Sequence, residues 1–149
     1  MARRVFFSFH YERDISRANI VRNSWVTKAD RDAAGFFDAG LWEEAKKKGD
    51  AAIRAMIDNA LKNTSVTAVL IGRDTADRNY VKYEIDQSIA RGNGVLGVYI
   101  HKIRNLAGEI DEDAKNPLPS KYSVHAWNRD KGYANFGTWV EDAAKAAGR

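Results

Sequence analysis

Apolar residues along this chain gather in short unbroken runs, and between the runs they recur at three- and four-residue spacing. Runs such as residues 66–71 are too uniformly apolar to keep one face in water, which is typical of strands buried on both faces. The runs predict strands at residues 3–10, 35–38, 66–71, 95–100 and 124–127. The spaced segments predict helices at residues 15–26, 50–61, 75–91 and 133–147.

Two connections have no such pattern. Residues 39–44 are expected to form a loop, and residues 101–121, with both prolines near the end, a long irregular segment. Strands that alternate with helices imply a parallel sheet covered on both faces, because parallel neighbours need helical crossovers. The predicted fold is therefore α/β and flavodoxin-like, a three-layer sandwich around a central five-stranded parallel sheet, with residues 1–149 as a single domain.

Glu84 is the candidate functional residue that this fold singles out. A parallel sheet of this kind places its site beyond the carboxyl ends of the strands, where the loops at residues 8–14 and 72–77 converge. Val81, Ile85 and Ile89 form the apolar stripe of the third helix, and Glu84 lies in the row beside it, about 6–11 Å from that edge by helical rise. The alternative is a Glu that pairs with a nearby Lys or Arg on a solvated helix face.

Composition narrows the functional classes. The longest apolar run is far short of the roughly 20 residues of a membrane helix, and the start of the chain does not resemble a signal peptide, so a cytoplasmic protein without membrane contact is expected. The absence of cysteine excludes disulfides and thiolate metal sites, and His101 and His125 have no third ligand at useful spacing, so no metal is expected.

Charge and glycine patterns exclude further classes. The net charge of +4 is mild and spread along the chain, so no nucleic-acid partner is expected. An anionic small-molecule ligand explains the excess of positive charge equally well. There is no Gly-x-Gly-x-x-Gly turn after the first strand and no P-loop, which argues against dinucleotide dehydrogenases and NTPases.

Two segments, Val5-Phe6-Phe7-Ser8-Phe9-His10 and residues 64–72, are similar to the first and third strands of a known family of α/β domains. Through them the chain resembles TIR domains, and most closely the bacterial TIR-like proteins of the Thoeris antiphage system. The segment Tyr80-Val81-Lys82-Tyr83-Glu84 resembles the Trp-x-x-x-Glu helix of the family, with Tyr80 in the place of the usual Trp. Residues 21–28 and 39–43 match the Thoeris group specifically, and the Arg-Asp-x-x-Pro-Gly box of animal signalling TIRs is absent.

The resemblance implies an enzyme that cleaves NAD as substrate, without a cofactor, and that uses Glu84 as the catalytic residue. One carboxylate suffices for this chemistry, because nicotinamide leaves from a cationic pyridinium without needing a proton. The residues implied as substrate contacts are Ser8, Phe9, His10, Asp38 and Tyr80. Three of them have ordinary alternatives, since Phe9 also suits a core, His10 a backbone-bonded position and Asp38 a turn.

The resemblance also implies a product and partners. A cyclic ADP-ribose isomer would act as an immune signal on a separate effector, with homo-oligomerisation on activation and a phage-derived trigger. Trp42, in the expected loop, would cover the cleft or contact a second subunit. Two competing hypotheses are a non-catalytic assembly module and a phosphoryl-accepting receiver domain. The receiver domain is disfavoured because the first strand ends in Phe-Ser-Phe-His and not in an acidic cluster.

Overall fold

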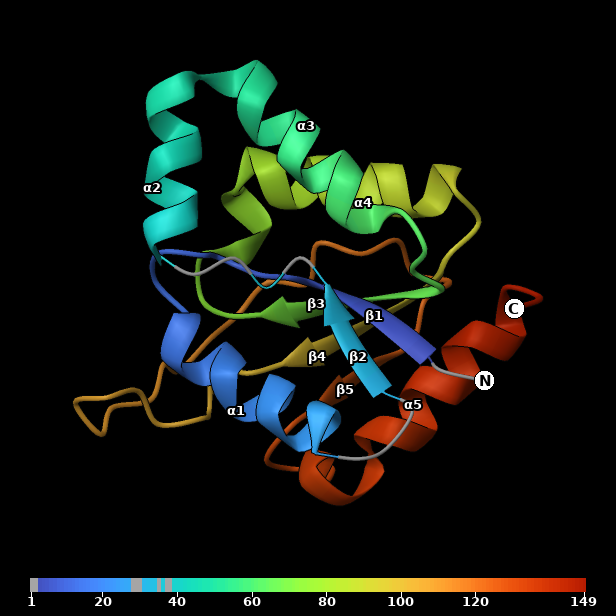
Figure 1. Cartoon of the computed structure of the whole chain (residues 1–149). Coiled ribbons are helices and arrows are strands. Elements are labelled where there is room, and N and C mark those ends of the chain that lie inside the picture. The colour runs from blue at the N-terminus through green and yellow to red at the C-terminus, as the bar shows by residue number, and fades with distance from the viewer. Residues whose placement is uncertain (1–2, 28–30, 35, 37–38) are drawn as a thin grey trace.

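A computed structural model describes residues 3–27, 31–34, 36 and 39–149. Within them a single sheet has the order β2-β1-β3-β4-β5, and every neighbouring pair is parallel (Figure 1). The strands are β1 (Arg3–Ser8), β2 (Arg31–Ala34), β3 (Val66–Ile71), β4 (Gly94–Tyr99) and β5 (Val124–Ala126). The helices are α1 (Ile15–Val26), α2 (Ala39–Lys48), α3 (Asp50–Leu61), the short 3₁₀ helix η1 (Thr75–Asp77), α4 (Asn79–Ala90) and α5 (Gly132–Ala146).

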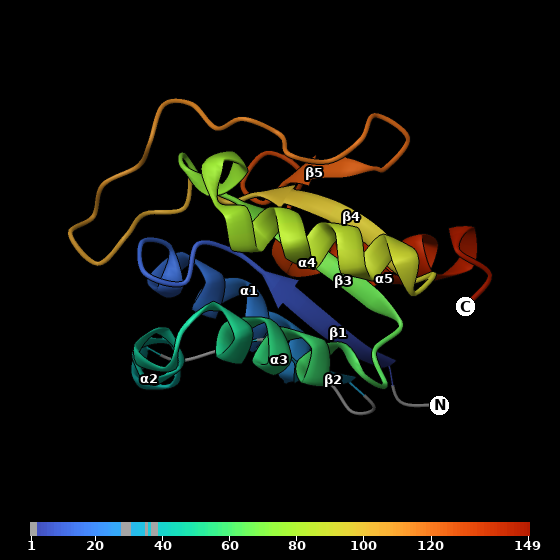
Figure 2. The ribbon, with the colours of Figure 1, turned by 90° about the horizontal axis from the view of Figure 1, so that it is seen from above.

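The helices cover both faces of the sheet. Helices α1 and α5 lie on one face, α3 and α4 on the other, and α2 stands beside the start of α3 (Figures 1 and 2). Every residue of β3 is buried, as its unbroken apolar run requires of a central strand with a helical layer on each side. The predicted α/β flavodoxin-like architecture is confirmed.

Two sequence predictions about the elements are wrong. Residues 39–44, predicted as a loop, form the first part of α2. This segment continues into Ala45 and three lysines, which are good helix formers, and Glu44 pairs with Lys48 one turn later at 3.5 Å. The lysines also lie in the last turn, where they complement the helix dipole.

The second strand was predicted too late in the chain. Strand β2 occupies Arg31–Ala34 and pairs with β1 in the register Arg3↔Arg31 to Phe6↔Ala34. This strand has no apolar run, so the pattern of apolar residues does not predict it. An edge strand tolerates polar residues because only one side of its ladder is paired. Of the predicted strand at residues 35–38, Phe36 is not in a strand, and the other three positions lie outside the described residues.

The sheet order defines where a site is expected. Strand β1 lies between β2 and β3, so the chain first winds to one side of β1 and then to the other. The loops that follow β1 and β3 therefore meet at the carboxyl edge of the sheet, as predicted. None of the described helices is both long enough and apolar enough to cross a bilayer.

Candidate active site

Glu84 lies in the second turn of α4 with its side chain completely buried beside the end of β1. The Ser8 hydroxyl, on the last residue of β1, donates a hydrogen bond of 2.7 Å to Glu84 Oε1. The Tyr11 hydroxyl, three residues further along the chain, donates to Glu84 Oε2. The alternative of a Glu on a solvated helix face is therefore wrong, and Ser8, a predicted substrate contact, lies against the candidate carboxyl group.

The environment of Glu84 changes its protonation. Burial raises the pKa of Glu84 from an ordinary 4.5 to about 8, while the hydrogen bonds from Tyr11 and Ser8 act in the opposite direction. Burial also raises the pKa of Tyr11 well above its ordinary value, and the negative charge of Glu84 adds to this effect. Around neutral pH the closed site therefore holds a neutral Tyr11 and a largely protonated Glu84.

Aromatic rings form a wall next to this carboxyl group. Tyr11 packs between Phe9 and Trp42, with ring centroids 4.5 Å and 4.7 Å away. The Trp42 ring also meets the ring of Tyr80 edge to face at 5.7 Å. Tyr80 lies one helical turn before Glu84, and its hydroxyl donates to Asp50 Oδ1 at 2.7 Å. Of the residues predicted to contact substrate, Phe9 and Tyr80 thus belong to this wall.

Trp42 does not have the exposure that the sequence suggested. Its side chain is 2% exposed, whereas its neighbour Leu41 is 52% exposed. Because residue 42 lies on the inward face of α2, its indole packs behind Tyr11 and cannot serve as an exposed contact for a second subunit. The expectation that Trp42 lies in a loop is wrong, because the residue belongs to α2, although its indole does border the site.

His10 and Asp38 are the remaining predicted contacts. His10 Nδ1 accepts a hydrogen bond from the backbone N–H of Arg13 at 3.1 Å, which is the backbone-bonded alternative considered for it. Burial lowers the pKa of His10, and the positive charge of Arg78 adds to the effect, so the ring stays neutral around pH 7. Asp38 lies outside the described residues.

Tyr11 and Glu12 are functional candidates that the sequence prediction missed. Glu12 Oε1 accepts hydrogen bonds of 3.2 Å from both Trp42 Nε1 and Lys46 Nζ, and lies 3.5 Å from Arg78 Nη2. Glu12 therefore ties the loop after β1 to α2 and to the residue that precedes α4. Their position in the chain could have revealed them, because both follow β1 within the loop that the fold places at the site.

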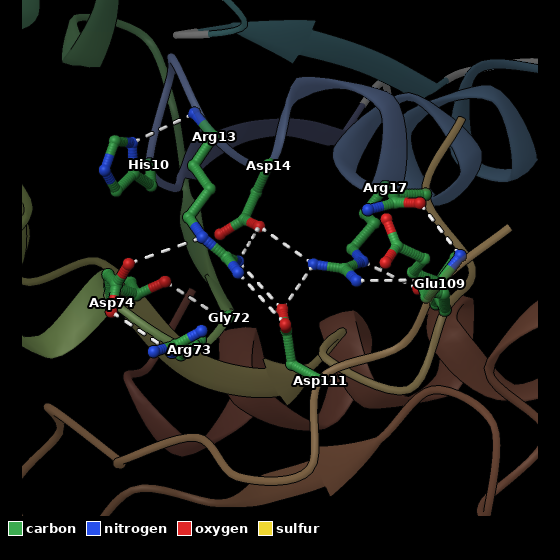
Figure 3. Close-up of polar contacts among 12 residues, drawn as sticks. His10, Arg13, Asp14, Arg17, Gly72, Arg73, Asp74, Glu109 and Asp111 are labelled. Atoms are coloured by element: carbon green, nitrogen blue, oxygen red, sulfur yellow. Dashed lines mark hydrogen bonds and ion pairs between the residues drawn. The ribbon is translucent and has the colours of Figure 1, made fainter. Parts of the chain in front are cut away.

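An ion cluster holds the other side of the same loop (Figure 3). The Arg13 guanidinium binds Asp111 with two bonds of 2.8 Å and 3.0 Å, and Arg17 adds a third of 2.8 Å. These bonds from Arg13 and Arg17 lower the pKa of Asp111 to about 2 against the effect of partial burial. Arg17, 2% exposed, also donates to the carbonyl oxygens of Ile103 and Glu109. The long connection after β4 is thereby fixed to the start of α1.

The turn after β3 completes the carboxyl edge. A Cβ atom on Gly72 would lie 2.2 Å from Asp14 Oδ2, so any larger residue would force the buried Asp14 side chain to move. The Gly72 N–H donates to Thr75 Oγ1 at 2.8 Å, which connects the turn to η1 and hence to the start of α4. Arg73, with its side chain 65% exposed, and Arg78, 37% exposed, add positive charge at the same edge.

Together these residues form a buried carboxyl group with two hydroxyl partners and an aromatic wall, flanked by the exposed Arg73 and the half-buried Arg78. Comparison with known proteins identifies the family of this chain. Residues 6–105 match the family described as "Thoeris protein ThsB, TIR-like domain". A protein of Bacillus cereus (strain MSX-D12), named "Putative cyclic ADP-D-ribose synthase ThsB1", is 46% identical over 141 residues, which are 94% of this chain and 72% of the relative. This chain therefore belongs to the TIR-like domain family of the Thoeris ThsB proteins.

Proposed function

We propose that this protein cleaves NAD at Glu84, releases nicotinamide and forms a cyclic ADP-ribose isomer as its main product. The observation that carries the proposal is the buried Glu84 carboxyl group, with its pKa raised to about 8 and two hydroxyl groups bound to it, at the carboxyl edge of a sheet in this family. The name of the Bacillus cereus relative, a putative cyclic ADP-D-ribose synthase, supports the product class. Buried carboxyl groups with a strongly shifted pKa at such an edge are typical of functional sites.

The chemistry needs little from the protein besides charge and position. The bond between ribose C1′ and the nicotinamide nitrogen breaks, and the nitrogen keeps the electron pair, so no proton donor is required. The cationic pyridinium of bound NAD would lower the pKa of the nearby Glu84, which would release its proton to solvent as substrate binds. The ionised Glu84 would then stabilise the positive charge that develops on the ribose in a site with little water. Ser8, fixed in β1 by the ladder with Val69, would hold the carboxylate in place.

The anionic part of NAD has a matching surface at the same edge. Backbone N–H groups at the start of a helix and exposed arginines are favourable partners for a pyrophosphate. Arg73 and Arg78 provide these charges beside the turn at Gly72. We assign the pyrophosphate to this turn and the reacting ribose to Glu84.

A cyclic product requires that a nucleophile in the ADP part reaches C1′ before water does. A group held in attacking geometry can have an effective molarity of about 10⁵ M or more, far above the roughly 55 M of liquid water. The buried rings of Phe9 and Trp42 are the apolar surface that would exclude water. We further propose that the product acts on a separate effector protein, with self-association and a phage-derived trigger in activation.

The second candidate function is a non-catalytic assembly module, in which Glu84 is a structural group. The complete burial of Glu84 favours this candidate, since a buried, hydrogen-bonded carboxyl group also serves to fix a helix to a strand. The two functions differ in one measurable property, which is the release of nicotinamide.

The test is incubation of purified protein with NAD, followed by chromatography and mass spectrometry of the products. We expect nicotinamide and a product lighter than ADP-ribose by one water from the parent protein, and a loss of about 10²-fold or more in Glu84→Gln. Asp86→Asn is the matched control, because it removes an acidic charge from an exposed position of the same helix. Equal activity in Glu84→Gln and the parent protein would remove Glu84 from the reaction.

A further inference from the structure

Access to Glu84 is closed in this structure. Glu84 and Ser8 are 0% exposed and Tyr11 is 3% exposed, so a ligand as large as a nucleotide does not reach the carboxyl group. The two hydroxyls that cover it differ in how firmly they are held. Ser8 is part of β1 and pairs with β3, whereas Tyr11 belongs to the loop between β1 and α1. Any opening that leaves the sheet intact therefore moves Tyr11 and not Ser8.

The loop that carries Tyr11 is a compact unit. Residues 10–13, here called the lid, are closed by a backbone hydrogen bond of 3.0 Å from the Asp14 N–H to the His10 carbonyl. His10 Nδ1 also binds the Arg13 N–H. On either side the lid is anchored by Phe9 and Asp14, both 0% exposed. The lid can therefore move as one piece between two fixed ends.

Polar contacts at the surface fasten the lid. Glu12 binds Lys46 and Arg78 on one side, and these three side chains are 37–41% exposed. Arg13 binds Asp111 and Asp74 on the other side. Exposed pairs of the Glu12 kind are each worth about 0.2–1 kcal/mol, so this half of the fastening is weak enough to open without unfolding the sheet. The arrangement is that of a closed lid with one weak edge.

We propose that the lid opens to admit substrate and that the Tyr11 hydroxyl, in the closed state, occupies the place on Glu84 Oε2 that a ribose hydroxyl of the substrate takes. The proposal rests on the proposed function for the identity of the substrate, but the movement of the lid does not. Tyr11 and a ribose hydroxyl are both neutral O–H donors. Opening thus exchanges one donor to the carboxylate for another of the same kind, and the Tyr11 ring leaves the space beside Trp42 and Phe9.

The lid has a quantitative consequence. If only a small fraction of molecules is open, the apparent dissociation constant for substrate rises in inverse proportion to that fraction. Glu12→Gln removes the charge that binds Lys46 and Arg78 and does not touch Glu84. We expect it to raise the open fraction about fivefold. Because Glu12→Gln also frees Arg78, which we assign to the pyrophosphate, the open fraction is measured without NAD.

The lid can be tested without any catalysis, because the chain contains no cysteine. Ser8→Cys places a thiol beneath the lid, and Ala68→Cys places one in β3, where labelling requires the sheet to open. With fast reclosing, the rate of thiol labelling is proportional to the open fraction. We expect the thiol at position 8 to react faster than the thiol at position 68, and Glu12→Gln to accelerate only the former about fivefold.

Glu44→Gln is the matched control, since it removes the same kind of exposed ion pair on α2 without touching the lid. Equal slow labelling at both positions, unaffected by Glu12→Gln, would overturn the lid even in a protein that cleaves NAD. The expected labelling pattern without any release of nicotinamide would contradict the proposed function and leave the lid in place. A fall in kcat in Tyr11→Phe, with KM unchanged, would identify the hydroxyl as part of the reaction and refute its role as a stand-in for substrate.

Discussion

The replacement Glu84→Gln should make this protein more stable around pH 7. In the folded chain the pKa of Glu84 is about 8 because of burial, whereas its ordinary value, which applies to the unfolded chain, is 4.5. Between these two values the folded state holds a proton that the unfolded state releases. The free energy of unfolding therefore falls as pH rises, with the full contribution of Glu84 present below pH 4.5 and lost as pH rises through about 8.

The size of the effect follows from the same two values. Each pH unit between 4.5 and about 8 lowers the free energy of unfolding by about 1.4 kcal/mol. At pH 7 the contribution of Glu84 is therefore about 3 kcal/mol smaller than at pH 4.5. Glutamine has nearly the same shape and does not ionise. Its carbonyl can accept the Tyr11 hydrogen bond, and the Ser8 hydroxyl, which donates to Glu84 in the structure, can turn to accept a hydrogen bond from the amide. A gain of about 3 kcal/mol corresponds to a rise in Tm on the order of 10 °C.

Thermal unfolding followed by circular dichroism across about pH 5 to pH 8 measures this effect. The difference in Tm between Glu84→Gln and the parent protein isolates Glu84, because all other titrating groups are common to both proteins. We expect the difference to be small at low pH and to grow toward pH 8. Asp86→Asn should show no such growth. Parallel curves of Tm against pH for Glu84→Gln and the parent protein, or a lower Tm of Glu84→Gln at pH 7, would refute the raised pKa of the buried Glu84.

Three further replacements test the surroundings of the site. Tyr80→Trp should keep more NAD cleavage than Tyr80→Ala, because it preserves a ring against Trp42, and equal rates in a kinetic assay would deny the ring a role. Trp42→Ala should lower the free energy of unfolding, measured in urea, by about 3–5 kcal/mol and shift the product toward linear ADP-ribose. An unchanged product ratio in mass spectrometry would show that Trp42 has no role in ring closure. Arg17→Met should cost about 3 kcal/mol in the same urea titration, because it leaves Asp14, Asp111 and two carbonyls short of a partner, and a neutral result would show that the cluster does not stabilise the fold.

The parts of this fold that could be predicted are those that local pattern determines. Strand β3 is an unbroken apolar run, and α4 has an apolar stripe next to which Glu84 lies, so sheet class, site edge and candidate carboxylate followed from the chain itself. Strand β2 was not predicted at its position, because an edge strand needs few apolar residues. Helix α2 was not predicted, because its apolar face is short and most of its remaining residues are charged.

The contacts around Glu84 depend on distance in space and not in sequence. Ser8 meets Glu84 across 76 positions, and Arg17 meets Asp111 across 94. Neither pair has a spacing that a pattern could reveal, because the loops that bring them together have no regular period. The burial of Trp42 likewise depends on which face of α2 turns toward Tyr11, which a residue assigned to a loop could not indicate.

The most direct test of the central claim is the release of nicotinamide from NAD by the purified parent protein, compared with Glu84→Gln and Asp86→Asn at equal concentration. Samples are taken over time, with and without phage-infected cell extract as a source of the trigger, and nicotinamide and the adenine-containing products are quantified by chromatography with mass spectrometry. The account predicts nicotinamide and a dehydrated ADP-ribose from the parent protein and from Asp86→Asn, with a loss of about 10²-fold or more in Glu84→Gln. Nicotinamide release at equal rates from the parent protein and a folded Glu84→Gln, or no release by the parent protein under either condition, would contradict it.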